Sequence, residues 1–527
     1  MARSISLVSL VSLFVLSACG GSVTPASGGG SSGAASATPG SPAGTSTGGT
    51  AGTTATTPAG TAGAPGAGGT AADAGRGGAN GGSVGTAGAA GPAGAPVASG
   101  GAGGGAGASG GGAAYDGKGF VVHEWGTNTV VVGSDGGMLR GLHHEQEDLP
   151  SFVYDRVKAG GLPGSTSVIE KMETPVTYFY APSELAVTAK VGFPAGVLTQ
   201  WYPAVRSFAP QIARTFPAGG PMQLLDPVLD PHFPFANAQC AANLSGVQGG
   251  LLDWGALTIL APGATGPMPE ASLDAFTWSY ARDVAANVVR LTGAPGVGTD
   301  AQHEKFLFYR GLGAFPLPWT VTAKSGGAVS LANPTKQKLG AAFVLNVGAN
   351  AGAFQAFPEG VSQGMSLDAI APSIEGASPL AQYADQLAAS VTQALDASGL
   401  YHDESVAMVR TWKAQWFRTP GLRVLYLMPA AAIDEQIPLT ITPKPDTTVR
   451  VMMMRVEIVT PEQEQADVAA ANAFVADEPQ AEAYFAALGR FAEPRLRRAI
   501  TLGATSGPAV DYLAKIATAN TSDATGE

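Results

Sequence analysis

The chain contains 527 residues, carries a formal net charge of −11 at pH 7 and is 45% hydrophobic. An acidic chain without clusters of lysine and arginine argues against nucleic acid as a partner, because phosphate binding needs basic side chains. Its two cysteines are too few for a disulfide-stapled fold, and its length suffices for two or three ordinary domains.

The first 19 residues have the features of a bacterial lipoprotein signal peptide. Arg3 supplies a positive charge, and the apolar stretch at positions 5–16 is too short to span a bilayer. The string LSAC at positions 16–19 resembles the lipobox, in which the cysteine becomes the site of lipid attachment. We therefore expect residues 1–19 to be a signal peptide and Cys19 to carry the lipid. The alternative is an ordinary secretory signal with an incidental cysteine.

A lipid on Cys19 would anchor the protein to a membrane of the cell envelope. Several acyl chains, at about 0.8 kcal/mol per buried methylene, give stable anchoring. Gly20 follows the cysteine where the common sorting rule places an aspartate for the inner membrane, so the outer membrane is favoured. We expect the folded part to lie in the periplasm or at the cell surface. Cys240 would then have no disulfide partner.

Residues 20–114 consist almost entirely of Gly, Ala, Ser, Thr and Pro. Such a segment has too little apolar surface to offset the entropy lost on folding, so we expect a disordered linker. A flexible Gly-rich coil of this length has a root-mean-square span of roughly 50–60 Å. The linker would hold the folded part well away from the lipid surface.

Residues 115–375 show the period-2 alternation of β-strands. Apolar residues alternate over residues 185–193, and a Pro-Ala-Gly turn then leads into a second strand that runs to Tyr202. Further predicted strands lie at 121–132, 175–180, 251–260, 305–309, 319–323 and 341–347. Short strands separated by Gly and Pro indicate a sandwich-like antiparallel region.

Residues 376–527 combine helices with strands. Ser378-Pro379 is typical of a helix N-terminus, and the string TPEQ at positions 460–463 is a capping-box pattern with proline at the first helical position. The predicted elements are a helix with its apolar stripe over 380–395, a helix carrying Trp412 and Trp416, strands at 422–428 and 449–459, and further helices within 480–513. The predicted fold class is therefore α+β: a β-rich, sandwich-like antiparallel region followed by a helix-rich α+β region.

The string HEWGT at positions 123–127 is the most distinctive candidate for chemistry. On a strand, Glu124 would share an apolar face with Val122, whereas His123 and Trp125 would point the other way. A carboxylate on an apolar face needs a cation or several donors. The candidate cations are Lys171, Arg282 and Arg310. A structural ion pair is the favoured interpretation; the alternative makes Glu124 a general acid or base and His123 a ligand or proton shuttle.

His143, His144 and Glu145 form the densest metal-like cluster, and Glu147 follows closely. The cluster lacks the HExxH spacing, and adjacent side chains on a strand face opposite ways. A solvated polar loop is therefore the favoured interpretation, with a metal site as the alternative.

Residues 360–364 match GxSxG, the pattern of a nucleophile elbow. An elbow needs a buried parallel strand before the serine and a long helix after it, with an aspartate and a histidine further on. The preceding segment is rich in Gly and Ala, and His402 is the one histidine downstream, so the context argues against a hydrolase elbow.

The seven tryptophans admit two interpretations. Exposed tryptophans of the β-rich region could stack on sugar rings, whereas buried ones belong to the core. Trp412 and Trp416 follow helical spacing among apolar neighbours, which favours the core.

Four strings occur in order over residues 119–460. They are HEWGTNTVV from His123, KMETPVTYFY from Lys171, EKFLFYRGLG from Glu304, and AMVRTW with GLRVLYLMP beginning at Ala407. Together they resemble an uncharacterised family of exported, often lipid-anchored bacterial proteins with the HEWGT signature near the start of the folded part. The resemblance implies export and anchoring but no activity or catalytic residue. Asn128 departs from the family at a position where an aromatic residue is expected.

The leading functional hypothesis is a lipid-tethered binding or interaction module of the cell envelope, with a glycan or an envelope protein as partner. The rival hypothesis is an envelope hydrolase or metal-dependent enzyme that uses Glu124 and His123, with Glu173, Arg310 or the His143 cluster as further candidates. A third hypothesis makes residues 376–527 a platform for docking a partner. The sequence implies no cofactor.

Overall fold

The computed structural model describes residues 113–144, 149–155, 168–209, 213–215, 223–224, 239–240, 249–271, 276–294 and 300–518. These residues belong to one compact unit, Gly103–Glu527. The predicted signal peptide with Cys19, and linker residues 20–112, lie outside the described residues.

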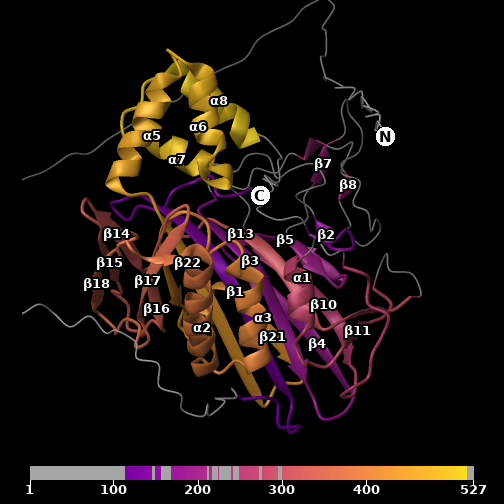
Figure 1. Ribbon diagram of the computed structural model, residues 1–527. Helices are drawn as coiled ribbons and strands as arrows, with labels where there is room; N and C mark the ends of the chain where they lie inside the picture. The colour runs from indigo at the N-terminus through magenta and orange to yellow at the C-terminus, as the bar shows by residue number, and fades with distance from the viewer. Residues whose placement is uncertain are drawn as a thin grey trace, which may run out of the picture. The chain divides into compact units, whose positions relative to one another are not determined.

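A ten-stranded sheet forms the centre of the fold (Figure 1). In spatial order its strands are β19 (Ser378–Pro379), β17 (Ala351–Phe357), β16 (Ala342–Val347), β20 (Gly421–Leu427), β22 (Thr447–Ile458), β1 (Val121–Val132), β3 (Glu170–Tyr180), β13 (Phe306–Gly313), β5 (Gly196–Tyr202) and β2 (Tyr154–Asp155). Strands from both predicted regions, 115–375 and 376–527, share this sheet and one hydrophobic core.

Strand β1 lies in the middle of the sheet, with the predicted bounds. All 12 of its residues are buried, and Val and Thr predominate among them, as suits a strand covered on both faces. It pairs in parallel with β22 and antiparallel with β3. The other pairings of the sheet are antiparallel, which confirms the predicted α+β class with mainly antiparallel strands.

A six-stranded sheet adds its buried residues to the same core. Its strands are β12 (Gln302–Glu304), β11 (Val289–Leu291), β10 (Gly250–Ile259), β4 (Leu185–Phe193) and β21 (Leu439–Thr442), with β6 (Ser207–Ala209) paired to β10. The predicted alternation in β4 is confirmed, because every second residue from Val187 to Phe193 is buried. The tight turn after β4 leads into β5 of the ten-stranded sheet, so these consecutive strands belong to different sheets.

Two three-stranded sheets complete the described strands. They consist of β14 (Thr320–Lys324), β15 (Ala328–Ala332) and β18 (Ser366–Ile370), and of β8 (Gln223–Leu224), β7 (Ala213–Thr215) and β9 (Gln239–Cys240).

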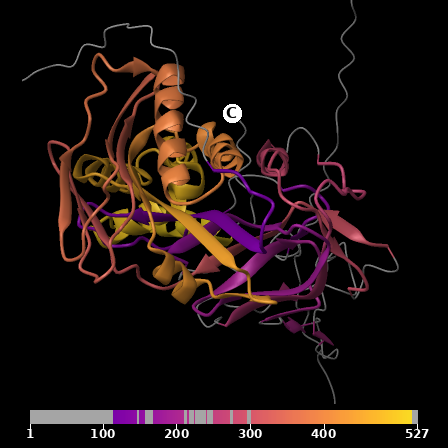
Figure 2. The same ribbon diagram turned by 90° about the horizontal axis from the view of Figure 1, so that it is seen from below.

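Helices α2 and α3 lie side by side over one face of the ten-stranded sheet (Figures 1 and 2). The first four helices are α1 (Phe276–Arg282), α2 (Leu380–Ala397), α3 (His402–Lys413) and α4 (Ala430–Gln436). In α2 the predicted stripe is buried from Tyr383 through Leu387 and Val391 to Leu395. The predicted start of this helix is corrected, because Ser378-Pro379 forms the edge strand β19 and the helix begins at Leu380.

The C-terminal helices are α5 (Pro461–Ala473), α6 (Glu478–Ala486), the short 3₁₀ helix η3 (Gly489–Phe491), α7 (Ala492–Thr501) and α8 (Gly507–Thr518). The predicted capping box is confirmed, because the Thr460 side chain accepts from the Gln463 backbone amide and the Gln463 side chain accepts in return from that of Thr460. These helices enclose a hydrophobic cluster of their own that includes Phe474, Phe485 and Leu496. None of the helices in the described part of the chain is long and apolar enough to cross a membrane.

All seven tryptophan side chains are buried, so they belong to the core. Trp412 lies in α3 but Trp416 lies in the turn after it, because α3 ends at Lys413, before the end of the helix predicted to carry both; their rings stack with centroids 4.6 Å apart. Stacking on an external sugar ring is therefore not open to any tryptophan in this conformation.

Candidate metal centre

Glu124 lies in a buried ion pair. Arg450 of β22 donates from Nε to Glu124 Oε2 at 2.7 Å, and Tyr309 and Thr177 donate to Oε1 at 2.6 and 3.1 Å. The partner is Arg450, rather than one of the three cations considered from the sequence, because β22 places residue 450 directly opposite residue 124. Both carboxylate oxygens are thus occupied by donors, as expected of a structural ion pair.

His123 points to the opposite face of β1 and belongs to a different network. Its Nδ1 lies 2.7 Å from Glu404 Oε2 at the start of α3. Glu404 also accepts from the Tyr180 hydroxyl and the Tyr401 backbone amide, each at 2.7 Å. His123 and Glu124 therefore do not form one acid–base pair.

Glu173 and Arg310, the other catalytic candidates, are buried charges of the same sheet. Glu173 pairs with Arg490 of η3. Although burial alone would raise the pKa of Glu173, the positive charges of Arg490 and Lys171 lower it to about 2. Arg310 donates to the Thr174 hydroxyl at 3.3 Å. Glu173 is thus a carboxylate at neutral pH and has the surroundings of a counterion rather than of a general acid.

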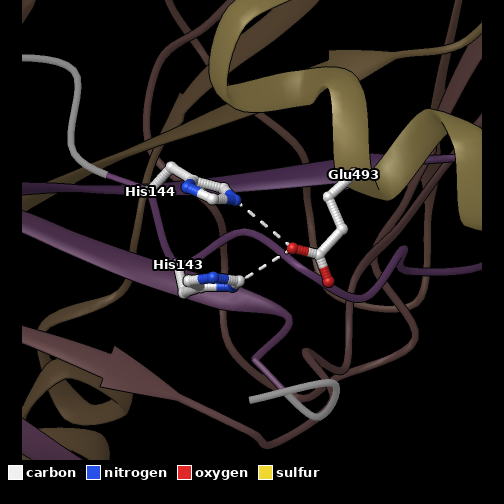
Figure 3. A group of neighbouring side chains, drawn as sticks. All are labelled: His143, His144 and Glu493. Carbon is white, nitrogen blue, oxygen red and sulfur yellow. Dashed lines mark hydrogen bonds and ion pairs between the residues drawn. The ribbon is translucent and has the colours of Figure 1, made fainter. Parts of the chain in front are cut away.

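His143 and His144 lie next to each other and both face Glu493 of α7 (Figure 3). His143 Nδ1 is 3.5 Å and His144 Nε2 is 3.3 Å from Glu493 Oε2, and the two rings are 4.1 Å apart. Within the described ranges, this is the group of three metal-binding side chains whose donor atoms all lie within 4.8 Å of one another. Glu145, predicted as a third member, lies outside the described residues.

The two histidines are largely buried, with side-chain exposures of 11% and 7%, in contrast to the solvated loop favoured from the sequence. The alternation of a strand does not apply to them, because the chain turns at residues 142–143. Gly141 makes room for the carboxylate: its φ is +106°, and a Cβ there would lie 2.6 Å from the carboxyl carbon of Glu493.

The pKa shifts of His143 and Glu493 suit metal binding. Burial, with the charge of His144 adding to it, lowers the pKa of His143 to about 4, so its ring is neutral at pH 7. Burial acts to raise the pKa of Glu493, but the hydrogen bond from His144 and the charge of Arg497 lower it overall. Neutral imidazole and carboxylate are the forms of these side chains that bind metals.

The two distances from the histidines to Glu493 also fit a small divalent ion. Zinc bonds of about 2.0–2.2 Å at tetrahedral angles place neighbouring ligand atoms about 3.3 Å apart. The two nitrogen–oxygen distances in the cluster are 3.3 and 3.5 Å. Arg497 donates to the other carboxylate oxygen, Oε1, at 2.7 Å, which leaves Oε2 directed at the histidines. Such a hydrogen bond is typical of carboxylates that hold a metal.

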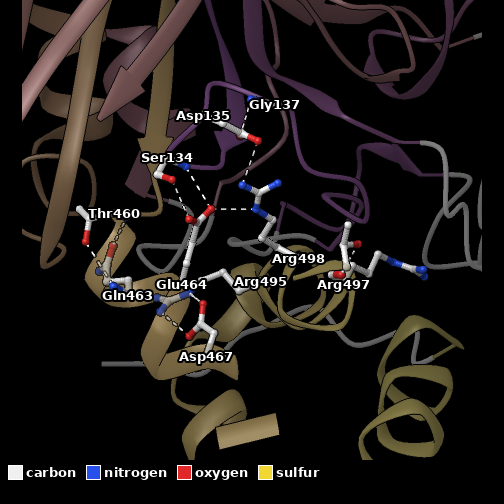
Figure 4. Close-up of polar contacts among 11 residues, drawn as sticks. Ser134, Asp135, Gly137, Thr460, Gln463, Glu464, Asp467, Arg495, Arg497 and Arg498 are labelled. Atoms are coloured by element: carbon white, nitrogen blue, oxygen red, sulfur yellow. Dashed lines mark hydrogen bonds and ion pairs between the residues drawn. The ribbon is translucent and has the colours of Figure 1, made fainter. Parts of the chain in front are cut away.

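A second set of polar contacts holds α5 and α7 at the turn after β1 (Figure 4). Glu464 of α5 accepts from the Ser134 hydroxyl at 2.6 Å and from Arg498 Nε at 2.7 Å. Arg498 also pairs with Asp135 at 3.0 Å. The helix that carries Glu493 is therefore also held, through Arg498, at the turn after β1.

The remaining sequence candidates lie apart from this cluster. His303 is a buried residue of β12, and His402 pairs with Asp396 at 3.0 Å at the start of α3. Ser362 of the GxSxG string is exposed between β17 and β18, and a strand rather than a helix follows it. No nucleophile elbow forms at residues 360–364.

Asn128, which departs from the HEWGT family, contacts an unusual carboxyl group. Its amide nitrogen lies 2.5 Å from Glu170 Oε1, and both side chains are buried. Burial raises the pKa of Glu170 to about 8, so this carboxyl is protonated at neutral pH. The pair is therefore uncharged in the folded protein.

Comparison with protein-family models and with curated proteins gives no match to the chain. The site itself therefore carries the evidence for function.

The decisive partners in these networks were not candidates from the sequence. They are Arg450, Glu404 and Glu493, which lie 326, 281 and 349 residues from the side chains they contact. No local pattern marks such residues. The one available signal is the rule that a buried charge needs a partner somewhere in the chain.

We expect Arg450→Met to lower the free energy of unfolding by about 3–5 kcal/mol, because it leaves Glu124 as a buried unpaired charge. Adding Glu124→Gln should recover most of the loss. Asp434→Asn is the control: it removes the exposed partner of the same arginine, 2.8 Å away, and should cost less than about 1 kcal/mol. Urea unfolding measures all of these changes. If the double variant were no more stable than Arg450→Met alone, this would contradict the ion pair between Glu124 and Arg450.

Glu170 predicts a specific pH dependence. Its pKa rises from 4.5 to about 8 on folding, so the folded protein keeps a proton that the unfolded chain releases between these values. Stability due to this group is full below pH 4.5 and is lost as the pH rises through 8. Glu170→Gln should match the unmodified protein near pH 5 and exceed it in urea midpoint near pH 9. The control is Glu435→Gln, at an exposed position. If the urea midpoint changed with pH by the same amount in all three proteins, this would argue against a protonated Glu170.

Proposed function

We propose that this chain is a lipid-anchored protein of the cell envelope whose folded part binds a divalent transition-metal ion through His143, His144 and Glu493. The observation that carries the proposal is the convergence of two imidazoles and one carboxylate, with ligand atoms within 4.8 Å of one another, in largely buried surroundings. These are ligands that zinc and similar ions prefer. The anchor at Cys19, and delivery to the outer membrane, are supported by the sequence of residues 1–20.

The charges around the site favour reversible binding over permanent incorporation. Arg497 offsets the charge of Glu493, and Lys171 donates to the backbone carbonyl of His144 at 2.6 Å. Two cations this close repel a divalent ion, so the affinity is lower than that of a site made of unpaired carboxylates. A binding module that takes up and releases an ion suits this arrangement. The glycan or envelope-protein partner expected from the sequence stays a prediction.

The rival hypothesis of a metal-dependent enzyme has one supporting observation. Three protein ligands leave a tetrahedral position for water, as in catalytic zinc sites. The version that uses Glu124 with His123 is disfavoured, because the oxygens of Glu124 are already bonded and the two side chains serve opposite faces of β1. Reversible binding is therefore the function that we propose first, and the metal-dependent enzyme is the second candidate.

Protein stripped with a chelator should bind one zinc ion per chain in calorimetric titration. His144→Gln and Glu493→Gln each remove a ligand and should weaken zinc binding by at least about 10-fold. His402→Gln, an exposed histidine outside the cluster, is the matched control and should leave the affinity unchanged. Zinc binding that survives both ligand substitutions would refute this site.

The lipid anchor has its own test. Cys19→Ser should move the protein from the membrane fraction to the soluble fraction of lysed cells, because the acyl chains that hold it in the bilayer are not attached. Cys240→Ser is the matched control and should leave the protein with the membranes. An unchanged distribution of the Cys19→Ser protein would contradict anchoring at this residue.

A further inference from the structure

We infer that a metal ion bound at His143, His144 and Glu493 locks the C-terminal helices onto the ten-stranded sheet, so that metal binding controls their docking. This inference rests on the proposed function and adds regulation to it.

The three ligands come from two distant parts of the chain. His143 and His144 lie in the turn segment that follows β1, whereas Glu493 belongs to the first turn of α7, 349 residues from His144. One ion bound to all three would therefore bridge the sheet and the helices. An ion held by the histidines alone would lack the one charged ligand of the site.

The C-terminal helices have the properties of a body that can move as a whole. Their hydrophobic cluster, which includes Phe474, Phe485 and Leu496, is distinct from the main core. Within the described chain, the polypeptide connects them to the sheet at one place, between the end of β22 and the start of α5, where Thr460 is the N-cap. Units with their own core and a single connection open and close cooperatively.

The interface between the C-terminal helices and the sheet contains several ion pairs and hydrogen bonds. It contains the pairs Arg490–Glu173, Arg498–Asp135 and Glu464–Ser134 in addition to the histidine cluster. Its apolar part is a small cluster in which Phe491 packs against Val131, Leu139, Leu142 and Val459. Charged groups regain their hydration when such an interface opens, so opening costs less than for an apolar interface of equal area.

The effect of the ion on docking follows from linkage. An ion that binds the docked arrangement and not the open one shifts the docking equilibrium by the factor 1 + [metal]/Kd. At a metal concentration of 100 times Kd, the shift is about 100-fold. In the absence of metal, the polar pairs and the apolar cluster around Phe491 hold the helices.

Hydrogen exchange on the full chain tests this inference, with saturating zinc or with chelator and with the bound zinc measured in the same samples. Amides of residues 461–518 should exchange more slowly with zinc, by up to about 100-fold at 100 times Kd. Amides of α2, which packs on the sheet through β17 and β19, should respond less. Bound zinc without slower exchange in residues 461–518 would overturn the inference and leave the proposed function standing. Absence of bound zinc would overturn both.

Two variants separate docking from ligation. Arg498→Gln loosens this interface without removing a ligand, so exchange in residues 461–518 should be faster in chelator and should be slowed again by zinc. Glu493→Gln should abolish the response to zinc. Lys515→Gln, which removes an exposed ion pair between α8 and α6, is the control and should keep the full response. A full response in Glu493→Gln would contradict the bridge.

Discussion

The rest of the structure depends on one requirement: the ionisable side chains on the central strand β1 must find partners inside the protein. The strand is buried along its whole length, and an unpaired charge there would cost several kcal/mol. Glu124 meets Arg450 of β22 on one face, and His123 meets Glu404 of α3 on the other. The ion pairs of β1 thus help to position the neighbouring strand β22 and helix α3.

Buried charges also need partners at the end of the sheet that contacts the C-terminal helices. Glu173 of β3 is compensated by Arg490 of η3, and Glu493 of the adjoining α7 faces the two histidines. Glu173 therefore has its arginine partner only when these helices pack against the sheet. The candidate metal centre lies at this boundary, where side chains from both parts meet, and not at the HEWGT string.

The features that could be predicted from the sequence are those encoded over a few residues. Alternation predicted β4, helical spacing predicted α2, and the string at positions 460–463 predicted the start of α5. The site could be predicted only in part, because its partners are remote in sequence. The histidines were recognised as a possible cluster, but the rule for strands suggested divergent side chains, whereas a turn at residues 142–143 brings them together. Glu493 carried no local signal.

The parallel pairing of β1 with β22 has a consequence for how the protein folds. The two strands meet at positions 326 residues apart, so the centre of the sheet cannot be completed until nearly the whole chain is present. Contacts of such long range form slowly. Until then one edge of β1, a strand rich in valine, stays open to pairing with other chains, which is a route to aggregation. Newly made protein therefore needs protection of this edge until β22, at residues 447–458, is present.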